Sequence, residues 1–380
     1  MLNRRRLLSV AAVAAAATAC AAPAPVPVPV PAPGPTPRLR MRGADISFAL
    51  QLEAAGSTVA ADGGVRPVES VLAAHGANLV RLRAWVDPPT GYSDLAMALR
   101  LGRRAAAAGC AIHLDLHYSD FWADPRSQRI PAAWQGLDGW ALAEVVRAHT
   151  RDAVAAFAAQ GTPLSMIQIG NEVTWGMLWP VGQIVAGPQE HWDGFAGLLH
   201  AGLAGAREAA PDLATMVHIE RSGDPGGSRR FFDTLFGRGI DVDVIGLSYY
   251  PFWHGSLDDL TGTLHLLAER YGKDVLVVET AYPSGLPADD RADYFVTDAD
   301  DLPDGDRFPP TPDGQAAFFE ELRAVLAAVP GDRGAGFCVW EPAWRGHEVG
   351  VRHGEGNPYA NLAMFDDGGR PLPALAAFRP

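Results

Sequence analysis

The chain has 380 residues, of which 48% are hydrophobic and 20% are charged, so it can bury a large core and is not an intrinsically disordered chain. It carries 44 acidic residues against 31 lysines and arginines, which gives a formal net charge of −13 at pH 7. This balance argues against nucleic acid or an anionic membrane surface as the main partner, and it is compatible with a neutral substrate such as a sugar chain.

The first 20 residues predict a signal peptide. Three arginines, residues 4–6, precede a short apolar run that ends in small residues, and Asn-Arg-Arg-Arg-Leu-Leu fits a twin-arginine export signal. The run is too short to span a bilayer. Thr18-Ala19-Cys20 resembles a lipobox, so a lipidated Cys20 is one alternative, and it would be the only membrane anchor. We expect an exported protein that is periplasmic, surface-bound or secreted.

The next segment, residues 21–38, alternates proline with alanine and valine. Proline fixes φ and removes the amide donor, so this segment is predicted to be an extended linker. Residues 39–380 are the predicted catalytic domain.

From Gly43 onward, apolar strand-like runs alternate with Ala- and Leu-rich helical stretches such as Tyr92–Ala108 and Gly139–Gln160. The eight predicted strands are Gly43–Ser47, Asn78–Trp85, Ala111–His117, Ser165–Glu172, Thr215–Glu220, Val242–Tyr250, Asp274–Thr280 and Gly334–Trp340. Eight βα units predict a single α/β domain, a (β/α)₈ TIM barrel, with a doubly wound open sheet as the alternative. No glycine-rich dinucleotide turn or P-loop is found, which favours the barrel.

Polar residues close these apolar strands. They are Asp45, Arg81, Arg83, Asp115, His117, Asn171, Glu172, His218, Glu220, Tyr249, Tyr250, Glu279, Trp340 and Glu341. Functional side chains of a barrel gather at the carboxyl ends of its strands, and charged groups there are costly to desolvate unless they are paired or used. The pattern therefore predicts a functional cleft. Cys110 and Cys338 lie in apolar surroundings and are predicted to be core residues.

Two of these groups suit glycosidic bond hydrolysis, which needs one protonated and one ionised carboxyl group across a cleft. Glu172 closes the fourth predicted strand and Glu279 the seventh. We predict Glu172 as the acid/base and Glu279 as the nucleophile. Arg81 and a tyrosine hydroxyl are expected to lower the pKa of Glu279, because a nearby cation favours the ionised form. Asn171 is expected to hold a sugar hydroxyl.

Longer motifs resemble one family closely. They include Gly-Ala-Asp-Ile-Ser (43–47), Val-Arg-Leu-Arg-Ala-Trp (80–85), His-Tyr-Ser-Asp-Phe-Trp-Ala-Asp-Pro (117–125), Gln-Ile-Gly-Asn-Glu (168–172), Ser-Tyr-Tyr-Pro-Phe-Trp-His-Gly (248–255), Val-Glu-Thr-Ala-Tyr-Pro (278–283) and Trp-Glu-Pro-Ala-Trp (340–344). Together they resemble the arabinogalactan endo-β-1,4-galactanases of glycoside hydrolase family 53. The resemblance implies endo-cleavage of β-1,4-galactan with retention of configuration and no cofactor, and it assigns the same two glutamates.

Tryptophans at strand ends fit a polysaccharide ligand, because an indole face packs on the C–H face of a sugar. Trp122 and Trp340 are predicted to contact substrate, with Trp340 under the sugar being cleaved. The other predicted substrate-binding residues are Asp45, Arg81, Arg83, Asp115, His117, Asn171, His218 and Tyr250. By contrast, Trp134, Trp140 and Trp192 lie in helical contexts and are predicted to be packing residues.

The sequence departs from the family pattern after strand five, where it reads His218-Ile-Glu220-Arg-Ser-Gly rather than an Asp followed by Asn-Gly. The loop after strand seven is rich in aspartate, and Asp298-Ala-Asp300-Asp-Leu302 keeps only part of a calcium pattern. We therefore predict a solvated acidic loop, with a structural calcium ion as the less favoured alternative.

Three other readings stay open for the function. The chain could be another β-1,4-glycanase of the same clan, such as a mannanase or a cellulase, or a catalytically silent carbohydrate-binding lipoprotein. A structural stalk protein is the third, and it would have no use for the polar strand ends. We expect a monomer that acts on neutral β-1,4-galactan and does not bind nucleic acid.

Overall fold

The structure is a computed structural model that describes residues 39–61, 63–352 and 355–380. The predicted signal peptide, the linker and Cys20 lie outside the described residues. Within the described part of the chain, no helix is both long enough and apolar enough to cross a bilayer.

Eight parallel strands form a closed barrel, which confirms the predicted (β/α)₈ fold. They are β1 (Met41–Asp45), β4 (Leu79–Ala84), β5 (Ala111–Leu116), β6 (Met166–Ile169), β9 (Ala214–Ile219), β10 (Val244–Tyr249), β11 (Asp274–Thr280) and β12 (Gly334–Trp340). They follow one another around the barrel in chain order, and β12 pairs with β1 to close it.

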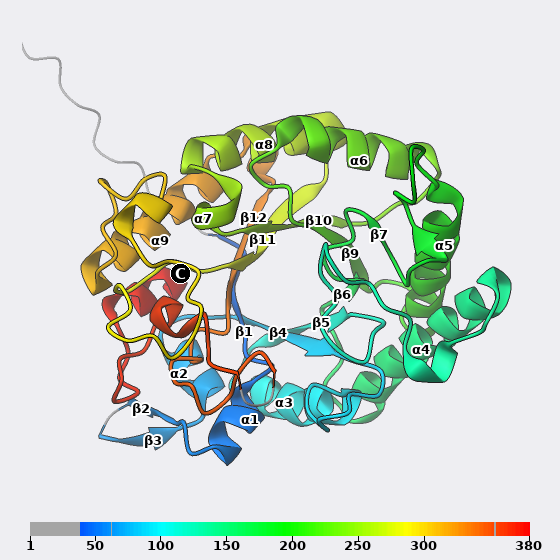
Figure 1. Cartoon of the computed structure of the whole chain (residues 1–380). Coiled ribbons are helices and arrows are strands. Elements are labelled where there is room, and N and C mark those ends of the chain that lie inside the picture. The colour runs from blue at the N-terminus through cyan, green and yellow to red at the C-terminus, as the bar shows by residue number, and fades with distance from the viewer. Residues whose placement is uncertain (1–38, 62, 353–354) are drawn as a thin grey trace, which may run out of the picture. The chain divides into compact units, whose positions relative to one another are not determined.

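Helices surround the barrel (Figure 1). They are α1 (Ala49–Ala54), α2 (Val68–Ala74), α3 (Leu95–Ala107), α4 (Gly139–Ala159), α5 (Trp192–Ala209), α6 (Pro225–Gly237), α7 (Pro251–His254), α8 (Leu257–Tyr271) and α9 (Pro312–Ala327). Short 3₁₀ turns are η1 (Ala132–Trp134), η2 (Ala299–Asp301), η3 (Pro330–Asp332), η4 (Ala360–Leu362) and η5 (Pro373–Phe378). The turn η5 packs against α9, in the place where an eighth helix would follow β12.

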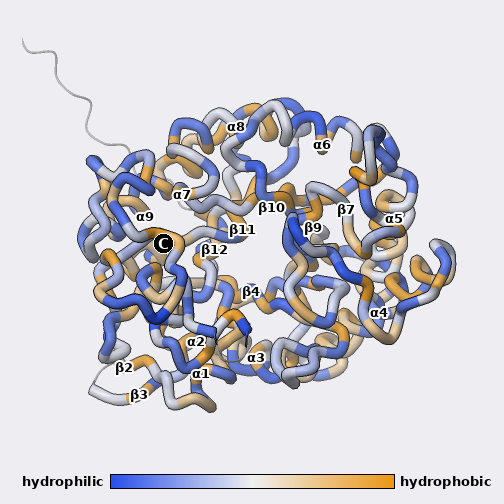
Figure 2. The backbone as a smooth tube through the Cα atoms, in the orientation of Figure 1, coloured by the Kyte–Doolittle hydropathy of each residue, from blue (hydrophilic) through white to orange (hydrophobic). Residues whose placement is uncertain are grey.

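The helices are amphipathic, as an outer layer on a buried sheet requires. Figure 2 shows hydrophilic and hydrophobic residues alternating along them. In α4 the buried stripe runs through Leu142, Val146, Thr150 and Ala153. Trp140 lies off this stripe and is 77% exposed, so its prediction as a packing residue was wrong, whereas Trp134 and Trp192 are buried as predicted.

Two small antiparallel hairpins were not predicted from the sequence. One pairs β2 (Val59–Ala61) with β3 (Gly64–Arg66), and the other pairs β7 (Gly176–Met177) with β8 (Gly182–Gln183). Strands of two or three residues are too short to show the alternation of apolar and polar residues that identifies a strand.

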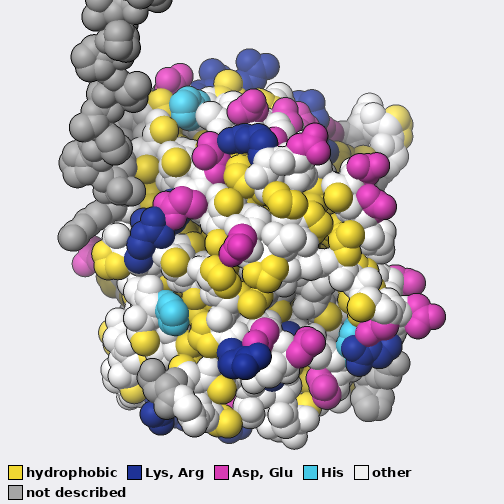
Figure 3. All heavy atoms as spheres, turned by 90° about the vertical axis from the view of Figure 1, so that its left-hand side faces the viewer, with side chains coloured by type: hydrophobic (Ala, Val, Ile, Leu, Met, Phe, Trp, Pro, Cys, Tyr) yellow, Lys and Arg dark blue, Asp and Glu magenta, His cyan; other side chains and the backbone are white. Residues whose placement is uncertain are grey.

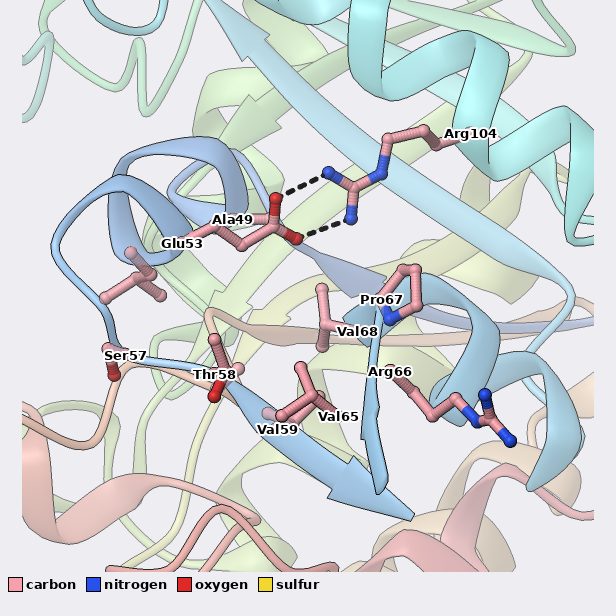
Figure 4. A pocket seen from close by; sticks show the side chains of 12 residues that line it. Ala49, Glu53, Ser57, Thr58, Val59, Val65, Arg66, Pro67, Val68 and Arg104 are labelled. Carbon is pink, nitrogen blue, oxygen red and sulfur yellow. Dashed lines mark hydrogen bonds and ion pairs between the residues drawn. The ribbon is translucent and has the colours of Figure 1, made fainter. Parts of the chain in front are cut away.

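A surface pocket lies beside the β2–β3 hairpin (Figure 4). Its apolar side chains include Leu52, Val59, Val65 and Val68, and Arg104 of α3 closes one side. The Arg104 guanidinium donates two hydrogen bonds to the Glu53 carboxylate, at 2.8 and 2.6 Å. None of the predicted site residues lines this pocket, so the predicted chemistry is located elsewhere.

Acidic and basic side chains are interspersed with apolar ones on the face that Figure 3 shows. Although the chain carries a net charge of −13, this face has no large area of a single sign.

The barrel interior changes from apolar to charged along the strands. Its apolar layer consists of Leu79, Met166, Met216, Val244, Leu276, Val278, Ala335 and Cys338. Alternate residues of a strand point to the same side, so the next inward positions are Arg81 after Leu79, Gln168 after Met166 and His218 after Met216. The polar residues therefore meet at the carboxyl ends of the strands. Cys338 and Cys110 are both buried, as predicted.

Candidate active site

Arg81 of β4 lies at the centre of the barrel mouth and is 1% exposed. Its Nη1 lies 2.9 Å from Oδ2 of Asp45 and 2.8 Å from Oε1 of Glu279. Its Nη2 donates to Oδ2 of Asp115 at 2.8 Å and to Oδ1 of Asn171 at 2.9 Å. The guanidinium of Arg81 on β4 thus contacts residues of β1, β5 and β11 and of the loop after β6. The planar, forked arrangement of donors in arginine permits these contacts.

Glu279 near the end of β11 is held on both carboxyl oxygens. Arg81 contacts Oε1, and the Tyr250 hydroxyl donates to Oε2 at 3.1 Å. Contacts with Arg81 and a tyrosine hydroxyl were expected from the sequence, and both lower the pKa of Glu279 as predicted; the effect of burial was not predicted. Burial raises the pKa of Glu279, and the positive charge of Arg81 opposes this rise without cancelling it. Glu279 is only 7% exposed, so the loss of hydration outweighs the effect of the cation on its pKa.

The predicted fourth strand reached Glu172, but β6 ends at Ile169, so Glu172 lies three residues beyond the observed strand. Gly170 has φ +81°, which a residue with a side chain rarely adopts, and this turn ends the strand. Glu172 itself has φ +47°, a conformation that is uncommon for a non-glycine residue. The turn directs the Glu172 side chain to β10, where the Ser248 hydroxyl donates to its Oε1 at 2.6 Å.

The carboxyl group of Glu172 has no cationic partner among the described residues. Among the described residues, nothing donates a hydrogen bond to its Oε2, and the Glu172 side chain is only partly buried, so Oε2 keeps some exposure to solvent. Loss of hydration raises the pKa of Glu172 well above its usual range, and the nearby carboxylates of Glu279 and Glu220 raise it further. Glu172 therefore keeps its proton to higher pH than an ordinary glutamate.

His117 forms a hydrogen-bonded pair with Asp115. Its Nδ1 accepts from the Trp85 indole at 3.3 Å and from the Ala123 amide at 3.2 Å, so the proton resides on Nε2, which donates to Asp115 at 3.0 Å. Burial alone would raise the pKa of Asp115, but Arg81 and His117 bring it down to about 2. Asp115 is therefore ionised.

His218 of β9 lies on the other side of Asn171. Its Nδ1 is 3.0 Å from Asn171 Oδ1, its Nε2 is 2.8 Å from Ser248 Oγ, and it is fully buried. Burial, together with the charge of Arg81, lowers the pKa of His218 well below its usual range. The imidazole is therefore neutral and carries a single proton.

Aromatic rings form one wall of the mouth. The Arg83 guanidinium lies over the rings of both Phe48 and Trp122, 4.2 and 4.5 Å from their centres, and its Nη1 is 2.8 Å from Glu341. Trp122 in turn contacts Trp340, with ring centres 6.0 Å apart. The indole of Trp340 also contacts the ring of Tyr359 at 4.5 Å.

The structure thus brings all twelve predicted site residues to one end of the barrel. It adds Gln168, Ser248 and Tyr359, which the sequence did not single out, and it pairs Glu341, one of the predicted polar strand ends, with Arg83. Gln168 and Ser248 could have been found, because they have the same inward parity as Met166 of β6 and Val244 of β10 in the apolar layer. Tyr359 carries no such signal, since it lies in an irregular segment before η4.

The aspartates of the loop after β11 mainly bind their own backbone. Asp298 caps the η2 turn, and the Asp301 carboxylate accepts from the amides of Thr297 and Asp298. Over residues 39–61, 63–352 and 355–380, no group of three His, Cys, Asp or Glu side chains is arranged to hold a metal ion.

Comparisons with known proteins agree with this site. The model of glycosyl hydrolase family 53 matches residues 41–378. A protein of Aspergillus terreus named "Probable arabinogalactan endo-beta-1,4-galactanase A" is 41% identical over 315 residues, which cover 80% of this chain and 85% of that protein.

Two solved structures are also similar. The GH53 catalytic domain of Ignisphaera aggregans has 34% identity and a TM-score of 0.84, covering 91% of this chain and 98% of its own. A fungal β-1,4-galactanase has 32% identity and a TM-score of 0.79, covering 90% of this chain and 99% of its own. A family match over nearly the whole barrel, with a shared fold, leads to one conclusion: the chain belongs to glycosyl hydrolase family 53 and is a glycoside hydrolase.

Proposed function

We propose that this chain is an endo-acting β-1,4-galactanase that cleaves with retention, with Glu172 as acid/base and Glu279 as nucleophile. The observation that carries the proposal is the unequal setting of the two carboxyl groups. Glu279 is held by Arg81 and Tyr250, whereas Glu172 has no cation and has one oxygen that keeps some exposure to solvent. Two carboxyl groups with different surroundings are what a double displacement needs.

In the first step, the Glu279 carboxylate attacks the anomeric carbon while the bond from that carbon to the leaving oxygen breaks. Glu172 gives its proton to the leaving oxygen, and the shorter chain departs as an alcohol. The products are a glycosyl ester on Glu279 and an ionised Glu172. Arg81 and Tyr250 keep the carboxylate oriented for attack, because each holds one of its two oxygens.

In the second step, Glu172 takes a proton from a water molecule, whose oxygen then attacks the anomeric carbon. The ester bond to Glu279 breaks, and both glutamates return to their starting protonation states. Two inversions at one carbon give net retention. Asn171 is fixed by Arg81 at its oxygen and by the Ala123 carbonyl at its amide, so it is positioned to contact a substrate hydroxyl.

The substrate proposal rests on the relatives. Their printed names include arabinogalactan endo-β-1,4-galactanase and fungal β-1,4-galactanase, at 41% and 32% identity to this chain. The aromatic wall of Phe48, Trp122 and Trp340 supports a sugar ligand, because such faces pack against pyranose rings. We propose no cofactor, since every step uses only side chains of this chain and water.

A product assay tests this function. The protein is incubated with linear β-1,4-galactan, β-1,4-mannan and carboxymethyl cellulose, and the products are separated by size. We expect short galacto-oligosaccharides from galactan alone, and none from the Glu279→Ala variant, which azide should rescue as an α-glycosyl azide. Cleavage of mannan or cellulose instead would overturn the substrate, and inactivity on all three would indicate a binding protein.

We also propose that residues 1–20 direct export, that residues 21–38 form a linker and that residues 39–380 are the catalytic domain. The arginine-led apolar run and the alternating prolines support these boundaries. Mass spectrometry of the exported protein tests them. An N-terminal lipidated Cys20 would show anchoring, whereas an unmodified start near residue 21 would show release.

A further inference from the structure

A buried hydroxyl lies behind the proposed acid/base, and this inference rests on the proposed function. Ser248 of β10 is fully buried, and its Oγ lies 2.6 Å from Glu172 Oε1 and 2.8 Å from His218 Nε2. It is the only donor to Oε1 among the described residues. No role for Ser248 follows from the two-step mechanism as written above.

The backbone explains why Ser248 points into the mouth. It has the same inward parity as Val244 and Gly246 on β10, and the pairing with β11 shifts between Leu247 and Ser248, so that Ser248 lies opposite Glu279. Gly246 makes room for the neighbouring strand, because a Cβ there would lie 2.6 Å from the sulfur of Met216. Ser248 is thus located between the two glutamates.

Which ring nitrogen of His218 carries the proton determines whether the Ser248 hydroxyl donates to His218 or to Glu172. The Nδ1 side of the ring faces the Gln168 amide nitrogen at 3.1 Å and the Asn171 oxygen at 3.0 Å. That oxygen already accepts from Arg81 at 2.9 Å. A proton on Nδ1 would draw the Ser248 hydroxyl towards Nε2 and leave Glu172 Oε1 without a donor.

A proton on Nε2 satisfies each of these groups. Gln168 then donates to Nδ1, His218 donates from Nε2 to Ser248, and the Ser248 hydroxyl has Glu172 Oε1 as its acceptor. All donors in this chain of hydrogen bonds point the same way, towards the carboxyl group. Glu172 Oε1 is therefore an acceptor in both protonation states, while Oε2 keeps some exposure to solvent.

We propose that Ser248, oriented by His218, is a positioning residue that occupies Oε1 of Glu172 and so assigns the transferable proton to Oε2. In the first step the proton leaves Oε2 for the glycosidic oxygen, and in the second step Oε2 receives the proton of the attacking water. Ser248 and His218 neither gain nor lose a proton. They keep the Glu172 carboxyl group in the same position, with Oε2 towards the substrate, through both steps.

The test compares leaving groups and pH profiles. For Ser248→Ala we expect kcat/KM to fall about tenfold on an aryl β-glycoside with a poor leaving group, a loss typical of one hydrogen bond to a charged group. With a dinitrophenyl leaving group, which needs little protonation, the loss should be below about twofold. The alkaline limb of kcat/KM should move to higher pH, because the Ser248 hydrogen bond lowers the pKa of Glu172.

Two further variants serve as controls. Ser248→Thr keeps the hydroxyl and should restore the wild-type limb. Ser222→Ala removes another fully buried hydroxyl, one without a hydrogen-bond partner among the described residues, and should leave the limb in place. If Ser248→Ala does not fold, Ser248→Cys replaces it, since a thiol is similar in shape and only a weak donor.

An unmoved alkaline limb in Ser248→Ala, with equal losses on both leaving groups, would overturn the proposal. The aryl glycosides carry whichever sugar the wild-type protein cleaves. The outcome for Ser248 is therefore separate from the outcome for galactan as the polymer substrate.

Discussion

Arg81 contacts three carboxyl groups of the mouth, and the shape of its guanidinium matters as much as its charge. Two nitrogens of one plane reach Asp45, Glu279, Asp115 and Asn171 at 2.8–2.9 Å. A lysine ammonium is a single point on a flexible chain and cannot span these partners. Any variant that removes the fork leaves buried carboxyl groups without their counter-ion, which is strongly destabilising.

We therefore expect Arg81→Lys to lower kcat on galactan by about a hundredfold or more and to reduce the free energy of unfolding by about 3 kcal/mol. Urea unfolding and initial rates measure the two effects. Arg104→Lys is the matched control, because Arg104 also binds a carboxylate with two nitrogens but lies beside the pocket of Figure 4. Unchanged turnover in Arg81→Lys would contradict the role given to the fork.

The two glutamates predict the pH profile. Turnover needs Glu172 protonated and Glu279 ionised, so kcat/KM falls as the pH rises through the pKa of Glu172 and as it drops through the pKa of Glu279. Burial is the main cause that raises both pKa values. Both the acid and the alkaline limb of the kcat/KM profile therefore lie above the ordinary glutamate pKa of about 4.3. At a pH between the pKa of these glutamates in the unfolded chain and their higher pKa in the folded protein, the folded protein binds more protons. The free energy of unfolding therefore falls as the pH rises through this range.

The variant Glu172→Gln separates the limbs. On a substrate with an activated leaving group, we expect the alkaline limb to disappear and the acid limb to remain, because only Glu279 still titrates. The profile is measured as kcat/KM from about pH 3 to 9. An alkaline limb that persists in Glu172→Gln would assign it to another group.

Among the elements, the eight strands could be predicted because buried parallel strands appear as short apolar runs that end in polar residues. The predicted ends differ where a turn intervenes: β6 was extended to Glu172, but Gly170 ends it after Ile169. The hairpins β2–β3 and β7–β8 are too short to show a period. The polar residues that end these apolar runs located most of the site.

The sequence could not predict the net pKa shift of Glu279, because opposing effects of burial and of nearby charges determine it. The contacts of Glu279 with Arg81 and Tyr250 were foreseen, but the direction of its pKa depends on how much water the surrounding fold removes. Nor could it place Tyr359 beside Trp340, because irregular segments bring distant residues together without a local pattern.

The η5 turn supplies a prediction about stability. Phe378 is fully buried against Phe337, with ring centres 5.8 Å apart, and its carbonyl accepts from Arg42 at 2.9 Å. We expect Phe378→Ala to reduce the free energy of unfolding by about 3–5 kcal/mol, with kcat unchanged in the folded fraction. Leu286→Ala, at a side chain that is 44% exposed, should cost less than about 1 kcal/mol in the same urea titration.

For the protein as a whole, the family match over residues 41–378 sets an expectation for truncation. A chain that starts at residue 39 should keep the melting temperature and the kcat of the full chain. A chain that starts at residue 44 should not fold cooperatively, because it loses most of β1 and the hydrogen bonds of Arg42. Differential scanning calorimetry of the two chains checks this, and a stable shorter chain would contradict the boundary.

The set of acidic groups around Arg81 has a consequence for inhibitors. Asp115 is ionised, the proposed nucleophile is ionised when it attacks, and Asp45 adds a third carboxyl group, yet one guanidinium contacts all three. The mouth thus has more negative than positive charge around Arg81. The reacting sugar ring becomes positively charged as its bond breaks, so the negative charge stabilises the transition state. A galactose-shaped iminosugar with a protonated nitrogen in place of the anomeric carbon carries this positive charge in its ground state. It should therefore bind in the mouth with a far lower Kd than the neutral sugar.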